Sequence, residues 1–445
     1  MAIGEALTHK KASLLAACVL FAISPTQLIQ AQSTHKTVRH VRVEETDPDA
    51  QALVLAESAI EKQDYTGAEA QLKKILDTHP EHYAAWYDLG FVYHALGNSD
   101  ESIAAYRKSV AAKPEVFESN LNLGLALADK EQPDAEQYLR TATKLKPTSN
   151  PEQGRKRAWM TLARVLARDK PDEAISAWQQ AGAVDPKDPE PHLMAGSLLE
   201  KQQRANDAEK EYRQALAIAP TSDDALIALT NMYMGQRRFS DAESLLHRLA
   251  AQRPNDAGIH MQFGRMLAVS GKTDDAIGEL ETGLKLDPND NKAQRDLADL
   301  YSDAGKYREA EELYGGLLKK APADAGLHFN FGRMLMRQKK FAEAEQQFGT
   351  AAQLKPDYGE AYGELAIAAN EMKDYPTVIK ATELRARYLP EIPMSVFLRA
   401  TAYDHLRAVK QATKYYHQFL DVAGGKYPEQ EWQAKHRLIA LEPKR

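Results

Sequence analysis

Prolines recur in this chain at an almost constant interval, and this regularity limits the fold more than any other feature. They lie at positions 80, 114, 147, 186, 220, 254, 288, 322, 356 and 390. The successive gaps are 34, 33 and 39 residues, followed by six gaps of 34. One further interval of 34 residues ends at Gly424. A period of this size indicates small structural units that stack in a row, so we expect a repeat protein.

Small residues follow the same period. Most units carry a glycine or alanine near their start, such as Gly264 and Gly332, and alanine follows twelve residues later, at Ala276 and Ala344. Larger apolar residues such as Tyr314 occupy positions between them. Small residues let two helices approach closely where they cross, and large residues fill the space around the crossing. The pattern therefore predicts two antiparallel helices in each unit and an all-α fold.

These features resemble the tetratricopeptide repeat, a helix–turn–helix unit with a W/L-x-x-L-G pattern near its start and a proline near its end. Trp86, Leu89 and Gly90 match that start, and the periodic prolines match the end. The resemblance covers residues 49–424. It implies a right-handed α-solenoid of about eleven repeats.

Two regions depart from the regular pattern. Repeats three and four, at about residues 115–186, are each one residue short, and we expect the loss in the turn between their two helices. The segment Ser149–Gly154 is inserted between these repeats and is expected to change the local geometry.

The end of the chain, residues 425–445, is predicted to form a capping helix and a tail. A terminal repeat exposes an apolar face, which an additional amphipathic helix can cover. We expect the following side chains of that helix to cover the last repeat: Trp432, Leu438, Ile439 and Leu441.

Residues 1–31 are typical of a secretory signal. Lys10 and Lys11 precede the largely apolar run Ala12–Ile23, and Ala31 is a suitable residue before a cleavage site. The apolar run is too short to cross a bilayer. Residues 32–48 are polar and aperiodic, which favours a flexible tether. We therefore expect an exported protein that is periplasmic or extracellular.

Cys18 is the only cysteine and lies within the apolar run. The sequence Leu15–Cys18 resembles the lipobox of bacterial lipoproteins, so attachment to a membrane through a lipid on Cys18 is an alternative to simple cleavage. The apolar run continues beyond Cys18, which favours cleavage. In either case the mature chain has no thiol for disulfides, catalysis or metal binding.

The remaining composition and motifs argue against nucleic-acid binding and against catalysis. The net charge of −6 offers no basic surface for a phosphate backbone. The sequence contains no phosphate-binding glycine motif, no H-E-x-x-H and no G-x-S-x-G. We predict a protein that is not an enzyme and has no cofactor and no metal. His260 and His328 are interpreted as residues that pack within their repeats.

The family resemblance also implies where partners bind. In tetratricopeptide proteins the first helix of each repeat lines a concave groove. The groove positions of the central repeats carry polar, apolar and cationic side chains: Asn231, Met261, Gln262, Arg265, Arg295, Phe329, Asn330, Arg333 and Arg337. Arginine can hold a carboxylate through two hydrogen bonds, and amide side chains can bind an extended backbone. The alternative is that these arginines are solvated or pair with Asp296 and Asp299.

The corresponding positions of the N-terminal repeats are apolar and aromatic: Leu53, Tyr87, Phe91, Leu121 and Leu125. They are suited to cover a hydrophobic helix, either of this chain or of a partner.

The sequence thus predicts a protein–protein interaction scaffold of the cell envelope that binds peptides or proteins. Two alternatives are a non-catalytic regulatory subunit of an envelope polysaccharide or peptidoglycan enzyme, and a scaffold that associates with itself.

Overall fold

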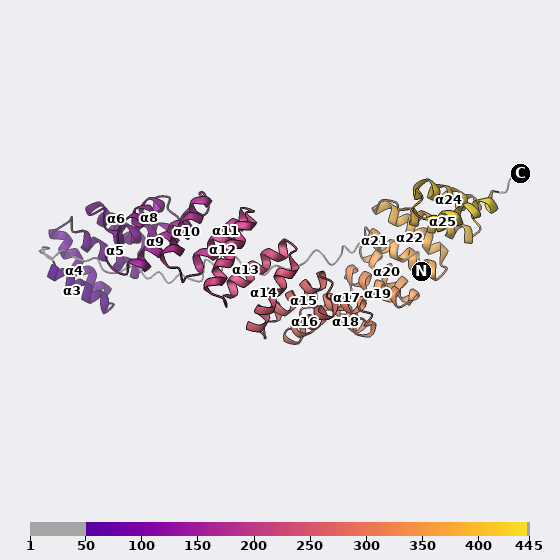
Figure 1. Ribbon diagram of the computed structural model, residues 1–445, viewed down its shortest axis with the longest axis horizontal. Coiled ribbons are helices and arrows are strands. Elements are labelled where there is room, and N and C mark those ends of the chain that lie inside the picture. Colours follow the sequence, from indigo (N-terminus) through magenta and orange to yellow (C-terminus); the bar gives the residue numbers. More distant parts are fainter. Residues whose placement is uncertain (1–49, 443–445) are drawn as a thin grey trace. The chain divides into compact units, whose positions relative to one another are not determined.

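The computed structural model describes residues 50–442, and this range contains 23 helices and no strands (Figure 1). Helices follow one another as eleven pairs and a final single helix. The pairs are α3 (Ala50–Glu61) with α4 (Tyr65–Thr78), α5 (Tyr83–Ala95) with α6 (Ser99–Ala112), α7 (Phe117–Asp129) with α8 (Ala135–Lys144), α9 (Pro151–Leu166) with α10 (Pro171–Val184), α11 (Glu190–Lys201) with α12 (Ala205–Ile218), α13 (Asp223–Gly235) with α14 (Phe239–Gln252), α15 (Ala257–Val269) with α16 (Thr273–Leu286), α17 (Asn291–Asp303) with α18 (Tyr307–Lys320), α19 (Ala325–Arg337) with α20 (Phe341–Leu354), α21 (Gly359–Glu371) with α22 (Tyr375–Tyr388), and α23 (Pro393–His405) with α24 (Val409–Ala423). The final helix is α25 (Pro428–Leu441). The predicted all-α helical repeat solenoid is confirmed.

These helices form two compact units, divided at Leu246 within α14. The N-terminal unit contains α3 to α13 and the start of α14. The C-terminal unit contains the remainder of α14 and α15 to α25. The predicted signal segment, Cys18 and the tether lie outside the described residues.

A repeated turn joins the two helices of most pairs. Its second residue has a positive φ angle, as at Gly305 (75°) and Lys339 (61°). The turn closes with a hydrogen bond that spans five residues, for example from the Lys306 N–H to the Tyr301 carbonyl. Glycine adopts positive φ without strain, which explains its use in several of these turns.

The shortened repeats differ from each other. In repeat four the turn is one residue shorter, as predicted, because the Lys170 N–H bonds to the Leu166 carbonyl, only four residues earlier. In repeat three the prediction is wrong, because the five-residue bond remains, from the Gln132 N–H to the Leu127 carbonyl. The missing residue is at the start of α8, which begins only at Ala135 and has 10 residues.

The insertion Ser149–Gly154 lengthens a helix. The helix α9 has 16 residues, against 13 in α7, and begins at Pro151. Proline suits the first position of a helix because that position needs no N–H donor and its φ angle is already helical. The additional residues therefore extend α9 at its N-terminus.

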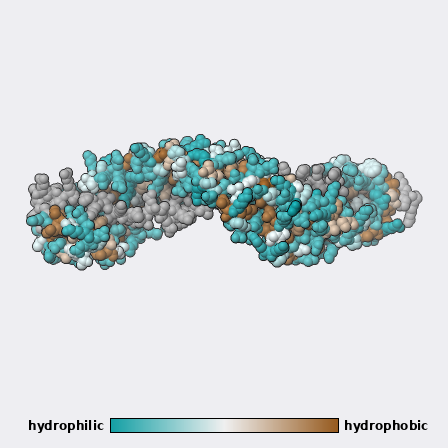
Figure 2. All heavy atoms as spheres, turned by 90° about the horizontal axis from the view of Figure 1, so that it is seen from below, coloured by the Kyte–Doolittle hydropathy of each residue, from teal (hydrophilic) through white to brown (hydrophobic). Residues whose placement is uncertain are grey.

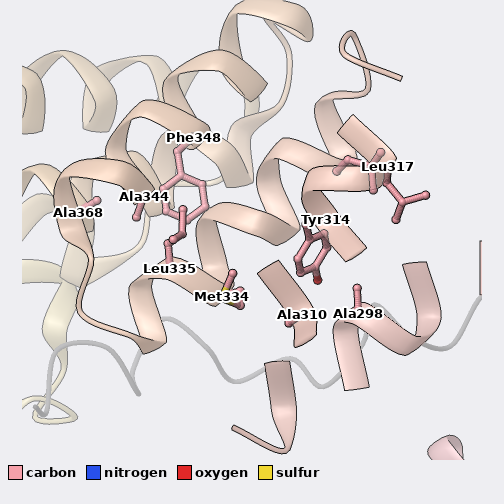
Figure 3. Close-up of a cluster of buried hydrophobic side chains, with 10 residues drawn as sticks. Ala298, Ala310, Tyr314, Leu317, Met334, Leu335, Ala344, Phe348 and Ala368 are labelled. Atoms are coloured by element: carbon pink, nitrogen blue, oxygen red, sulfur yellow. The ribbon is translucent and has the colours of Figure 1, made fainter. Parts of the chain in front are cut away.

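Small residues meet large ones at the helix crossings of the C-terminal unit (Figure 3). Phe348 of α20 is fully buried. Its ring packs so closely on Gly332 that a Cβ atom added to this glycine would lie only 2.7 Å from the ring. Tyr314 of α18 stacks on Phe331 of α19 with ring centroids 5.6 Å apart. The first contact holds the two helices of one repeat together. The second joins a first helix to the second helix of the preceding repeat.

A side chain at the fourth position of several first helices ties each repeat to the proline that ends the previous one. Its N–H group donates to the proline carbonyl six residues earlier: Trp86 to Pro80 (2.7 Å), Asn120 to Pro114 (2.7 Å) and Gln294 to Pro288 (2.7 Å). His260 and His328 make the same contact, at 3.1 and 3.0 Å, to Pro254 and Pro322. The interpretation of both histidines as packing residues is confirmed.

The capping helix packs on the last repeat through different residues from those predicted. Gln430, Ala434 and Leu438 are buried, whereas Trp432 is 60% exposed and Ile439 is 72% exposed. The buried residues are four apart and form one stripe of the helix, and Trp432 lies on its opposite side. The prediction is correct for Leu438 and for the partly buried Leu441, which contacts the same apolar cluster, and wrong for Trp432 and Ile439.

Candidate functional site

The first helices α15, α17, α19 and α21 follow one another in the C-terminal unit, and the first three carry eight of the nine predicted groove residues. The ninth, Asn231, is half-buried on α13 in the N-terminal unit. We use the name arginine face for the surface that carries the following side chains: Arg265, Arg295, Phe329, Asn330, Arg333 and Arg337. Figure 2 shows one side of the molecule, on which hydrophilic side chains predominate and hydrophobic ones form small groups.

Two predicted groove residues offer little surface. Met261 and Gln262 on α15 are 3% and 5% exposed. The Met261 side chain fills the space beside Gly283 of α16, where a Cβ atom would lie 2.7 Å from the Met261 Cγ. Met261 therefore acts as packing between α15 and α16.

Three of the four predicted arginines pair with an acid of a neighbouring repeat. Arg265 Nε lies 2.6 Å from Asp296 of α17, and both side chains are largely buried. Arg295 pairs with Asp324, which precedes α19. Arg337 pairs with Asp303 of α17 and donates to the Ser302 hydroxyl at 3.1 Å. These ion pairs join successive first helices, and the predicted pairing with Asp296 occurs at Arg265.

Arg333 differs from these three arginines. It is half-buried on α19 and makes no hydrogen bond or ion pair with any residue of the range 50–442. It does influence the ionisation of two acids, Asp299 and Glu364. Its guanidinium group therefore keeps its donors available beside a partly apolar surface. Phe329 contributes to that surface and packs against Phe348 and Tyr358, with centroids at 5.8 and 5.0 Å.

The first acid near Arg333 is Asp299 of α17. Burial raises the pKa of Asp299 to about 6, although the hydrogen bond from the Tyr314 hydroxyl and the charge of Arg333 act in the opposite direction. The Asn330 amide donates to both Asp299 carboxylate oxygens at 3.2 Å. Asp299 thus has neutral hydrogen-bond donors as partners, and burial makes it harder to ionise than an exposed aspartate.

The second acid, Glu364 of α21, was not predicted from the sequence. Burial raises the pKa of Glu364, and the charges of Arg333 and Arg337 offset only part of this rise. The spacing of the repeats could have identified Glu364 from the sequence. Glu364 follows Arg333 by 31 residues, as Asp296 follows Arg265 by 31. Burial disfavours the charged form of both acids near Arg333, and Arg333 is the one arginine of the arginine face that forms no ion pair within residues 50–442.

The apolar groove predicted in the N-terminal repeats is not an open surface. Leu53, Tyr87, Leu121 and Leu125 are between 0% and 5% exposed. Tyr87 is held within the core, where its hydroxyl accepts a hydrogen bond from the Asn122 amide at 3.0 Å. Phe91 of α5 is only partly buried, and the expectation that these residues cover a hydrophobic helix stays a prediction.

Two further features of residues 50–442 bear on function. They contain no group of three or more His, Cys, Asp or Glu side chains placed to hold a metal ion. None of the helices in this range is both long enough and apolar enough to cross a membrane.

Comparison with protein families gives matches described as tetratricopeptide repeat. One family matches residues 53–116, 93–150, 164–223 and 295–359, which together make up half of the chain. A second tetratricopeptide repeat family matches residues 199–261.

Individual proteins are more distant. The DnaJ protein P58IPK homolog A of Oryza sativa subsp. japonica is 26% identical over 158 residues, which is 33% of either chain. The match therefore spans about a third of that relative's length. Among solved structures, YrrB, described as a TPR protein with an unusual peptide-binding site, is 18% identical with a TM-score of 0.38 and covers 42% of this chain and 96% of its own. The APC/C hetero-tetramer Cut9–Hcn1 is 14% identical with a TM-score of 0.38 and covers 89% of this chain and 96% of its own.

Proposed function

Because the chain belongs to the tetratricopeptide repeat family, we propose that it is an exported, non-catalytic scaffold that binds peptide or protein partners on the arginine face. The family is in general one of protein–protein interaction scaffolds. Export is supported by the sequence of residues 1–31 and rests on that sequence alone.

The observation that carries this proposal is the state of Arg333. A half-buried guanidinium without an ion pair has lost part of its hydration and gains more from a carboxylate than an exposed one does. Neither neighbouring acid, Asp299 or Glu364, forms an ion pair with Arg333 in the described range, and burial disfavours the charged form of both. An acidic side chain or the terminal carboxylate of a partner peptide supplies the missing charge.

The surroundings of Arg333 suit an extended peptide. Phe329 and Met336 are partly buried and pack on the apolar cluster of α17 to α20, so each leaves some apolar surface for a side chain of the partner. Arg295 and Arg337 are more than a third exposed although they are paired, and they can exchange their acids for a ligand at small cost. The arginine face therefore combines one strong anchor with several weak ones.

The test uses the full chain and an array of short extended peptides, each made with a free carboxylate and with an amidated terminus. We expect a subset of acidic peptides to bind, with binding weakened at least about tenfold by Arg333→Ala, since a charge-assisted bidentate contact contributes about 1.5–3 kcal/mol. Arg333→Lys should recover only part of this affinity.

Two matched controls locate the effect. Arg265→Ala occupies the equivalent position of repeat seven, where the arginine is already paired, and Arg308→Ala removes a highly exposed arginine of α18. Arg308→Ala should bind as the wild type does, and Arg265→Ala should weaken binding less than Arg333→Ala, with helicity checked by circular dichroism. Equal losses for Arg333→Ala and Arg308→Ala, or no acidic peptide bound by the wild type, would exclude the arginine face as the binding site.

A further inference from the structure

The large hydrophobic side chains with the greatest exposure lie at the two ends of the described array. In the range 51–442, four of them are exposed by 60% or more: Val54 (60%), Leu55 (61%), Trp432 (60%) and Ile439 (72%). The first two belong to α3, the first described helix, and the other two to α25, the last. All other exposed large hydrophobic residues in this range are at 51% or below.

The residues at the α3 end occupy positions that the preceding repeat covers elsewhere in the array. Leu55 directly precedes the small residue Ala56, as Phe331 precedes Gly332, and Phe331 stacks on Tyr314 of the preceding repeat. Val54 corresponds in the same way to Asn330, which bonds to Asp299 of the preceding repeat. The α3 end therefore presents the surface on which a preceding repeat packs.

The residues at the α25 end occupy positions that are buried in several internal repeats. Trp432 is the fifth residue of α25, and the fifth residues of α15 and α23, Met261 and Phe397, are each 3% exposed. Ile439 is the twelfth residue, and the twelfth residues of α13 and α17, Met234 and Ser302, are each 5% exposed. No described helix follows α25 to cover these side chains.

The Trp432 side chain is held in place as an anchor. Its ring lies 3.8 Å from the ring of His436, one turn later, and the His436 Nδ1 bonds to the Trp432 carbonyl at 2.9 Å. A rigid aromatic side chain loses little conformational entropy when it is covered, which is why such residues often dominate interfaces.

Charges between the apolar side chains also suit a contact between the two ends. On α25, Lys435 and His436 lie between Trp432 and Ile439 and are exposed, whereas Glu429 and Glu431 precede Trp432. The sequence of α3 contains Glu57 and Glu61 and no basic residue. The basic segment of α25 between its two exposed apolar side chains is thus opposite in charge to α3.

We propose that copies of this chain join end to end, with the α25 end of one copy covering the α3 end of a second copy. The contact places α25 against the surface of α3 that a preceding repeat covers elsewhere in the array. Because the two surfaces are different, the contact is heterologous, and repeated addition gives open chains, or rings where the rotation between copies closes. The proposal does not depend on the arginine face.

Sedimentation velocity of the full chain over a range of concentrations tests this proposal. We expect the average mass of the wild type to rise steadily with concentration, and Val54→Glu, Trp432→Glu and Ile439→Glu each to remain monomeric. Leu354→Glu, which replaces a 41% exposed leucine of α20, is the control and should assemble as the wild type does. Circular dichroism verifies that each variant keeps its helices.

Mixing the variants identifies which ends meet. Val54→Glu keeps an intact α25 end and Trp432→Glu keeps an intact α3 end, so an equimolar mixture should give a dimer and no larger species. A wild type that stays monomeric would refute the proposal. So would dimers of Val54→Glu alone, because they would show that two α25 ends meet each other.

Discussion

Repeats seven and nine have nearly the same first helix but different surroundings for its arginine. The sequences His260–Leu267 and His328–Leu335 differ at only two of eight positions. Even so, Arg265 forms an ion pair with Asp296 at 2.6 Å, whereas Arg333 forms none with any described residue. The chemistry of a position on this array therefore depends on the next repeat as much as on its own.

The acid that follows each arginine explains the difference. Thirty-one residues after Arg265 the chain places an aspartate, and at the same distance after Arg333 it places a glutamate, Glu364. Burial raises the pKa of Glu364, which favours its neutral form. Repeat seven uses its arginine to join α15 to α17. In repeat nine Arg333 forms no ion pair within the described range, and our proposal assigns it to a partner.

The largest effect that distinguishes the two repeats is expected at their glycines. A Cβ atom on Gly264 would lie 3.0 Å from the backbone oxygen of Ala276, which cannot move away. A Cβ atom on Gly332 would instead meet only the ring of Phe348, which can shift. We expect Gly264→Ala to lower the free energy of unfolding by about 2–3 kcal/mol and Gly332→Ala by about 1 kcal/mol. Urea denaturation followed by circular dichroism measures both, and equal losses would contradict this distinction.

The sequence predicted the architecture well because its signals are local and repeated. The prolines and the small residues specify helix pairs, and every described pair ends before one of the periodic prolines or before Gly424. The site was harder to predict. Whether Arg333 forms an ion pair depends on Glu364 in the next repeat and on how deeply that side chain is buried, and the sequence pattern does not show the depth of burial. The outward position of Trp432 was missed for a similar reason. An apolar residue was assumed to cover the array, although only its helical phase decides which way it points.

The second largest difference is expected for the arginines themselves. Arg265→Met leaves Asp296 as a largely buried charge without its partner and should lower the free energy of unfolding by about 2 kcal/mol. Arg333→Met removes no ion pair and should change it by less than about 0.5 kcal/mol. The double variant Arg265→Met/Asp296→Leu should recover most of the loss, and a failure to recover would show that the pair itself is not the cause.

A third prediction concerns the dependence on pH. Burial raises the pKa of Asp299 to about 6, above the ordinary value of an aspartate in the unfolded chain. Its contribution to stability is therefore fully present below about pH 4 and is lost as the pH rises through about 6. Asp299→Asn, which keeps a neutral side chain, should increase the free energy of unfolding by about 1 kcal/mol at pH 7.5 and leave it unchanged at pH 4.

The matched control for this variant is Asp296→Asn, on the same helix. It loses the ion pair with Arg265 and should therefore lower the free energy of unfolding at pH 7.5, the opposite sign from Asp299→Asn. Urea denaturation at both pH values compares the two variants. The same sign for both at pH 7.5 would show that the two acids do not differ in the way the structure indicates.

The smallest difference is expected at the histidines. His260 Nδ1 contacts a carboxylate, Glu279, at 2.7 Å, and His328 Nδ1 contacts an amide, Gln347, at the same distance. In both repeats the other ring nitrogen contacts a proline carbonyl and acts as the donor. Glu279→Gln converts the first arrangement into the second, with an amide oxygen in place of a carboxylate oxygen beside Nδ1.

We expect Glu279→Gln to change the free energy of unfolding by less than about 0.5 kcal/mol, because every hydrogen-bonding group keeps a partner. Glu279→Ala is the matched control and should cost about 1 kcal/mol, since it leaves His260 Nδ1 without a partner in a largely buried position. Urea denaturation at neutral pH measures both variants. A loss for Glu279→Gln as large as that for Glu279→Ala would show that repeat seven requires the charge of the carboxylate. Repeats seven and nine would then differ at their histidines as well as at their arginines.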